Sequence, residues 1–196
     1  MYPINIAPAG EVEPKIEKAP SAIEGRDIAT VIGRFYLWQK MEEEGKERLL
    51  ELQADNAVIF YVGEHFAVGE EVPAGPGDVL AAGAVEAIYL CGDVVMTEGQ
   101  RTVRADEMYY DFLRKKAVAV NAVMRSFDAG RGIPIYVRAA KLHQIAENIF
   151  AAENITLTSS EFYLPQISLN ASSVIITDTT EIDERLGKLS DSSYDA

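Results

Sequence analysis

The most constraining feature of the sequence is a change of phase inside a strand-like segment rich in β-branched and aromatic residues. Val103 and Ala105 are two residues apart, as one face of a β-strand requires, but the apolar series then continues at Met108 and Tyr110. Side chains change face at every residue, so a step of three keeps them on one side only if the strand bulges or bends. The sequence therefore predicts a bend between Ala105 and Glu107.

The same phase change occurs four times, each time directly after an alanine. The four alanines are Ala54, Ala105, Ala139 and Ala171. They are separated by 51, 34 and 32 residues, and the longest interval contains a Gly/Pro-rich insertion at residues 70–84. Such repetition is typical of a supersecondary unit whose copies bury one face against their neighbours. In the first two copies the next residue is Asp55 or Asp106, a carboxylate that can accept hydrogen bonds from backbone N–H groups and stabilise the corner.

Short apolar runs joined by polar turns predict an all-β protein. We expect repeated short antiparallel strands that form an open β-jelly roll or a solenoid-like sandwich. Residues 1–28 contain four prolines and are expected to be an extended N-terminal segment. Residues 29–180 form the predicted jelly roll with the insertion at about 70–84, and residues 181–196 are expected to be a short helix or an acidic tail.

The composition excludes several classes of function. A net charge of −13 and a pI near 4.6 argue against nucleic-acid binding, which needs clustered Lys and Arg, and predict repulsion from an anionic membrane surface. The two histidines, His65 and His143, lie in different copies without metal-ligand spacing, and no Gly-x-Ser-x-Gly elbow occurs. We therefore predict no catalytic residues, no metal site and no cofactor. The single cysteine, Cys91, is expected to be a small buried residue in a strand.

The second copy carries a resemblance to a known family. Residues 92–111, GDVVMTEGQRTVRADEMYYD, combine a short strand after a glycine, a turn, and the series apolar-x-Ala-Asp-x-apolar-x-Tyr-Asp. This segment resembles the OstA-like β-jelly-roll domain of bacterial lipopolysaccharide transport, which forms the periplasmic bridge protein and the N-terminal part of the outer-membrane assembly protein. The resemblance covers roughly residues 33–178. The third and fourth copies depart from it, because Ala140 and Ser172 replace the aspartate.

The resemblance implies a non-enzymatic, lipid-binding conduit module in lipopolysaccharide transport to, or assembly at, the bacterial outer membrane. The implied partners are lipopolysaccharide or a related lipid, and other jelly-roll transport proteins that pair through edge strands, with a possible head-to-tail oligomer. The implied location is the periplasm or the periplasmic face of the outer membrane. Such a protein must be exported, and residues 1–28 lack an apolar segment of the length a secretion signal needs, so we expect the signal to lie outside this chain.

If the copies stack into a jelly roll, their inward faces make a groove for acyl chains. The expected lining residues are Val103, Ala105, Met108, Tyr110, Val118, Val120, Val137, Leu142, Ile155 and Leu157. Burial of methylene groups gives such a groove affinity at roughly 0.8 kcal/mol each. Periodicity does not separate an open groove from a packed core. A structural β-solenoid scaffold or self-assembly module without lipid binding is thus an alternative, and a carbohydrate-binding jelly roll is another.

Overall fold

The computed structural model describes residues 4–20, 26–43, 46–62, 78–80, 85–99, 101–128, 132–146, 149–178, 181–183, 188–190 and 194–195. These residues form β-strands, turns and bends, and contain no helix, which confirms the predicted all-β class. It follows that no helix in the described part of the chain is long and apolar enough to cross a membrane.

Between residues 85 and 178, each strand forms a hairpin with the next strand along the chain. In chain order, the structure contains β1 (Ile4–Pro8), β2 (Lys15–Pro20), β3 (Asp27–Glu43), β4 (Lys46–Tyr61), β5 (Asp78–Leu80), β6 (Val85–Glu98), β7 (Arg101–Asp111), β8 (Lys116–Asp128), β9 (Ile133–Ala146), β10 (Ile149–Thr158), β11 (Leu169–Asp178), β12 (Glu181–Asp183), β13 (Lys188–Ser190) and β14 (Tyr194–Asp195). Turns at Gly99 and Lys115 separate β6 from β7 and β7 from β8, and both residues have positive φ.

Twelve of the strands form one antiparallel sheet. Its order is β14-β11-β10-β9-β8-β7-β6-β4-β3-β1-β5, and β2 also pairs with β3. The sheet is open, because among the residues that the structure describes the end strands β14 and β5 pair only with β11 and β1. This agrees with the predicted open antiparallel architecture, although the strands are longer than the short segments expected. β3 has 17 residues and β4 has 16, since the bend curves each strand without ending it.

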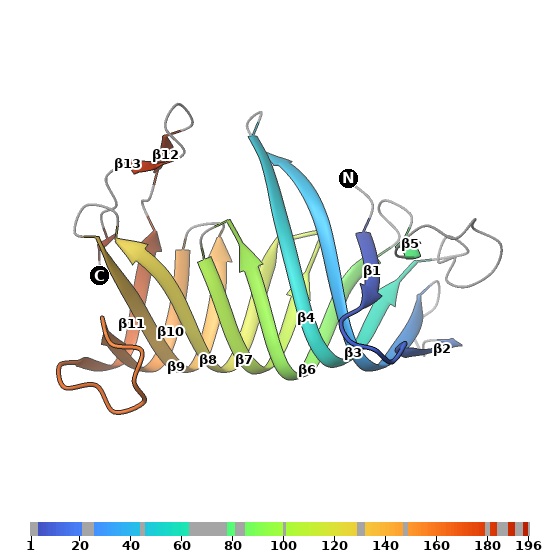
Figure 1. Ribbon diagram of the computed structural model, residues 1–196, viewed down its shortest axis with the longest axis horizontal. Helices are drawn as coiled ribbons and strands as arrows, with labels where there is room; N and C mark the ends of the chain where they lie inside the picture. The colour runs from blue at the N-terminus through green and yellow to red at the C-terminus, as the bar shows by residue number, and fades with distance from the viewer. Residues whose placement is uncertain are drawn as a thin grey trace.

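Each long strand bends near its middle, and the bends lie at one level across the sheet (Figure 1). In β7, Val103, Ala105, Met108 and Tyr110 are all buried, so the inward series changes phase at Asp106 as the sequence predicts. The extra residue itself lies in β6. Cys91 pairs with Glu107 and Val94 with Ala105, which leaves two residues opposite one and makes a β-bulge.

The hydrophobic core lies between the two halves of the bent sheet. A single flat sheet leaves one face in water, yet Phe35, Leu37, Leu52 and Leu90 on the inner face have no exposed surface at all. No second layer covers them within the described residues, so the sheet buries its own inner face by bending. One contiguous cluster of buried side chains extends from Ile4 in β1 to Ile176 in β11.

The N-terminal segment joins the sheet. β1 pairs with the half of β3 after the bend and β2 with the half before it, so the two short strands together run alongside β3. The prolines at positions 8, 14 and 20 suggested a separate extended segment, but an edge strand needs few backbone donors and tolerates proline. Inward-facing Ile4 and Ile6 anchor β1 in the core.

The other predicted segments lie partly outside the described residues. Of the insertion at 70–84, only β5 is described, and it pairs with β1. For residues 181–196, the short helix is not found among the described residues. Glu181–Asp183 and Lys188–Ser190 instead pair with each other as β12 and β13.

Candidate functional site

The bend forms a continuous ridge across the sheet with two alternating kinds of strand. One kind carries a residue with positive φ: Gly33 (111°), Gly92 (81°), Asn121 (51°) and Asn154 (52°), in β3, β6, β8 and β10. The other kind, β4, β7, β9 and β11, carries the repeated alanine and the residue that follows it. Glycine and asparagine adopt positive φ most readily, which explains their use in every second strand.

The two corner aspartates accept hydrogen bonds from neighbouring strands. Arg34 Nη1 donates to Asp55 Oδ1 at 2.9 Å, and Arg34 Nη2 lies 3.0 Å from Asp93 Oδ2. Asn121 Nδ2 donates to Asp106 Oδ2 at 2.8 Å. The hydrogen bond to Asp55 is the main reason that the pKa of Arg34 is raised above its usual value. The carboxylates thus link adjacent strands at the bend, with side chains as the donors.

The corner alanines lie on the concave side of the bend, where side chains have least room. Ala54, Ala105 and Ala139 are buried, and Ala171, near the end of the sheet, is half-buried. A small side chain fits here because the two halves of the sheet converge towards the ridge. This group of residues is therefore structural, and it determines the shape of the space between the halves.

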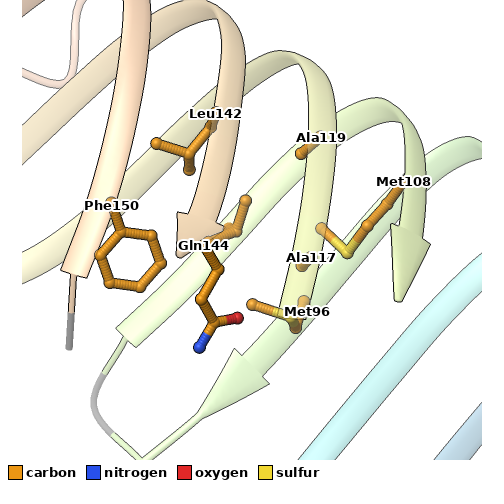
Figure 2. A pocket seen from close by; sticks show the side chains of 8 residues that line it. Met96, Met108, Ala117, Ala119, Leu142, Gln144 and Phe150 are labelled. Carbon is orange, nitrogen blue, oxygen red and sulfur yellow. The ribbon is translucent and has the colours of Figure 1, made fainter. Parts of the chain in front are cut away.

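A small apolar pocket lies between the two halves of the sheet (Figure 2). It is lined by Met96, Val103, Met108, Ala117, Ala119, Leu142, Gln144 and Phe150. Met96 pairs with Val103 in one half, whereas Ala119 pairs with both Met108 and Leu142 in the other. The cavity has a volume of about 10 Å³, close to the room that one water molecule needs. It exists where β8 contributes two alanines in place of larger side chains.

An inward-facing cation bridges the two halves beside this pocket. Arg101, at the start of β7, lies with its guanidinium carbon 4.5 Å from the centre of the Phe150 ring in the opposite half. Its Nη1 is also 3.5 Å from Glu98 Oε2, and the two side chains are only 13% and 9% exposed. A cation over an aromatic face is attracted by the ring quadrupole, so this contact holds the halves together.

The structure distributes the ten predicted groove residues over three environments. Val103, Met108 and Leu142 line the pocket. Ala105, Tyr110, Val137 and Ile155 are buried elsewhere in the core, and Leu157 packs against it. Val118 and Val120 lie on the outer face, half-buried, because Ala117 and Ala119 take the inner positions of β8.

The error in β8 has a clear physical reason. All four residues from Ala117 to Val120 are apolar, so alternation does not choose a face, and the larger valines were assigned to the interior. Sequence reasoning also missed Met96, Gln144 and Phe150 as lining residues, and missed Arg101. Inward alternation from Val94 to Met96 was available as a signal, but the contact of Arg101 with Phe150 joins residues 49 positions apart and has no local signature.

Other polar and aromatic side chains do not gather into one site within the described residues. No group of three metal-ligating side chains occurs within the described residues. His143 is on the outer face with Nε2 3.8 Å from Glu153 Oε1, and His65 lies outside the described residues. Tyr110 is buried edge-to-face against Phe112, with ring centres 4.9 Å apart, so it does not share an exposed platform with Tyr109. Cys91 is half-buried in β6.

Comparison of the chain with protein-family models, curated proteins and solved structures finds no match.

Proposed function

We propose that this chain is a non-enzymatic lipid-binding conduit module of the OstA-like type, which takes part in lipopolysaccharide transport to, or assembly at, the bacterial outer membrane. The proposed location is the periplasm or the periplasmic face of that membrane. The observation that carries the proposal is the apolar pocket between the two halves of an open, bent sheet. The repeated bend and the segment around Ala105 and Asp106 support the family assignment.

The pocket offers an acyl chain an apolar environment. Seven of its eight lining side chains are apolar, and a buried methylene group contributes roughly 0.8 kcal/mol. With a cavity volume of only about 10 Å³ the pocket is far smaller than the roughly 300 to 1,000 Å³ typical of ligand pockets. The proposal therefore requires the two halves of the sheet to separate near Arg101 and Phe150 when an acyl chain of the lipid enters the pocket.

The sheet has the free edge that an edge-to-edge assembly needs. β11 pairs with β10 along its length, but on its other side it pairs with β14 only at Thr177 and Asp178. The remaining backbone groups on that side of β11 have no strand partner within the described residues, and such edges bind further strands. We propose other jelly-roll transport proteins, or a second copy in a head-to-tail arrangement, as the partner there.

A second candidate function is a structural scaffold that binds no lipid. It is favoured by the complete burial of Leu37, Leu50 and Leu52 in β3 and β4, where the interior is packed rather than hollow. The two candidates differ in one property. A scaffold predicts that filling the pocket changes stability only, whereas a conduit predicts that it also reduces lipid binding.

The test is a titration of the purified chain with lipopolysaccharide and, separately, with a neutral phospholipid. Ala119→Leu fills the pocket from within, and Val118→Leu is the matched control on the outer face of the same strand. We expect selective binding of lipopolysaccharide by the wild type, a reduction of about tenfold in Ala119→Leu, and no change in Val118→Leu. Circular dichroism and the thermal midpoint show that each variant is folded. A folded wild-type chain that binds no lipopolysaccharide contradicts the conduit and supports the scaffold.

A further inference from the structure

The loop between β10 and β11 exposes an unusual set of large apolar side chains. Phe162, Tyr163 and Leu164 are 73%, 84% and 84% exposed, and Ile167 is 85% exposed. The loop extends beyond the body of the sheet at the end that carries β11 (Figure 1). A cluster of exposed large apolar side chains of this kind marks an interaction site.

Hydrogen bonds from the sheet hold this loop in place. Arg138 Nη2 donates to the carbonyl oxygens of Glu161 and Phe162, at 2.7 and 3.1 Å. Thr158 Oγ1 donates to the Ile167 carbonyl at 2.8 Å, which joins the two ends of the loop. The apolar side chains are therefore presented by a braced backbone whose carbonyl groups at these points are already satisfied. Immersion of the loop in an apolar medium costs less when its backbone groups have partners.

The geometry of the side chains favours a lipid surface over a groove in another protein as the binding partner of this loop. Phe162, Tyr163 and Leu164 are consecutive, so their side chains leave the backbone in different directions, and all three are almost fully exposed. A protein groove accepts one face of a segment, whereas a lipid surface accepts side chains on all sides of a loop. Tyrosine is also enriched at the boundary between lipid and water.

The net charge of the protein favours a neutral lipid surface over an anionic one. Glu161 is the only acidic or basic residue in the loop, residues 159–168, and the whole chain carries a net charge of −13. An anionic surface repels such a protein, and no basic residue of the loop offsets this. We infer that the loop at residues 159–168 docks the protein on a neutral lipid surface by inserting Phe162, Tyr163 and Leu164. This inference is independent of acyl-chain binding in the pocket.

The test is co-sedimentation of the intact chain with phosphatidylcholine vesicles. We expect the wild type to bind, Leu164→Asp to reduce the partition coefficient roughly tenfold or more, and Val12→Asp to leave it unchanged. Val12 is the matched control, because it is 79% exposed and lies at the other end of the chain. Both residues are exposed, so neither variant should alter the thermal midpoint. Addition of anionic lipid to the vesicles should weaken binding at low salt.

A second measurement locates the insertion directly. Tryptophan fluorescence of Tyr163→Trp should shift to the blue on addition of the same vesicles, and that of Val12→Trp should not. Absence of wild-type binding, full binding by Leu164→Asp, or equal losses in Leu164→Asp and Val12→Asp each overturn the inference. The first of these results indicates that the loop contacts a protein instead.

Discussion

Gly92 lies so close to Asp55 that a β-carbon added to the glycine would be 2.8 Å from the Asp55 Oδ2 atom and 2.9 Å from its β-carbon. Gly92 also has a φ of 81°, in the range that L side chains rarely adopt. The glycine of one strand and the aspartate of the next are thus fitted to each other at the ridge.

Replacement of Gly92 by alanine should destabilise the fold markedly. The positive φ costs about 1–2 kcal/mol and the crowding against Asp55 about as much again, so we expect a loss near 3 kcal/mol. Gly99→Ala is the matched control, because Gly99 has a φ of 60° but nothing within 4 Å of the added carbon. Urea unfolding should show a loss of about 1 kcal/mol for Gly99→Ala. Equal losses in the two variants would refute the steric fit.

Asn154 provides a separate test of the bend. It is exposed and has a φ of 52°, so Asn154→Gly should be neutral within about 0.5 kcal/mol, whereas Asn154→Val should cost roughly 2 kcal/mol. Thermal or urea unfolding measures both values. A valine variant as stable as the glycine variant would mean that β10 does not need positive φ at the ridge.

The contact between Asp111 and Arg114 in the turn after β7 should make a pH-dependent contribution to the free energy of unfolding. Burial would raise the pKa of Asp111, but hydrogen bonds from the Arg114 guanidinium at 2.7 Å and its backbone N–H at 2.8 Å outweigh this and lower the pKa below its usual value. A lowered pKa in the folded state means that the charged carboxylate stabilises the fold above the unfolded pKa. This contribution is lost as the pH falls through the folded pKa.

Asp111→Asn should therefore be less stable than the wild type by about 1 kcal/mol at pH 7, and the difference should shrink below about pH 4. Urea unfolding at a series of pH values measures the difference. A difference that stays constant down to pH 2 would show that the carboxylate charge has no part in the stabilisation.

Removal of one charge of the buried Glu98–Arg101 pair should destabilise the fold more than removal of both charges. Arg101→Met leaves the buried Glu98 carboxylate with less compensation, and we expect a loss of about 3 kcal/mol. Glu98→Gln/Arg101→Met removes both charges and should recover most of this loss. Unfolding of the two single variants and the double variant completes a cycle. Additive losses would mean that the two charges do not interact.

The sequence was sufficient for the features that depend on local alternation. The step from Ala105 to Met108 predicted the bend correctly, because a phase change has few structural explanations. It was insufficient where both phases are apolar, as in Ala117 to Val120, and where residues meet across the core. Arg101 and Phe150 belong to different hairpins, and their contact depends on how the two halves of the sheet face each other.

The measurement that tests the central claim most directly is methyl NMR of the methionine-labelled chain in the presence of lipid A, the acylated part of lipopolysaccharide. Met96 and Met108 line the pocket, while Met124 is buried in the core but does not line it. If acyl chains enter between the halves of the sheet, intermolecular NOEs will connect their methylene protons to the methyl groups of Met96 and Met108, and those to Met124 will be weak or absent. Bound lipid that shows no NOE to Met96 or Met108 would contradict the conduit.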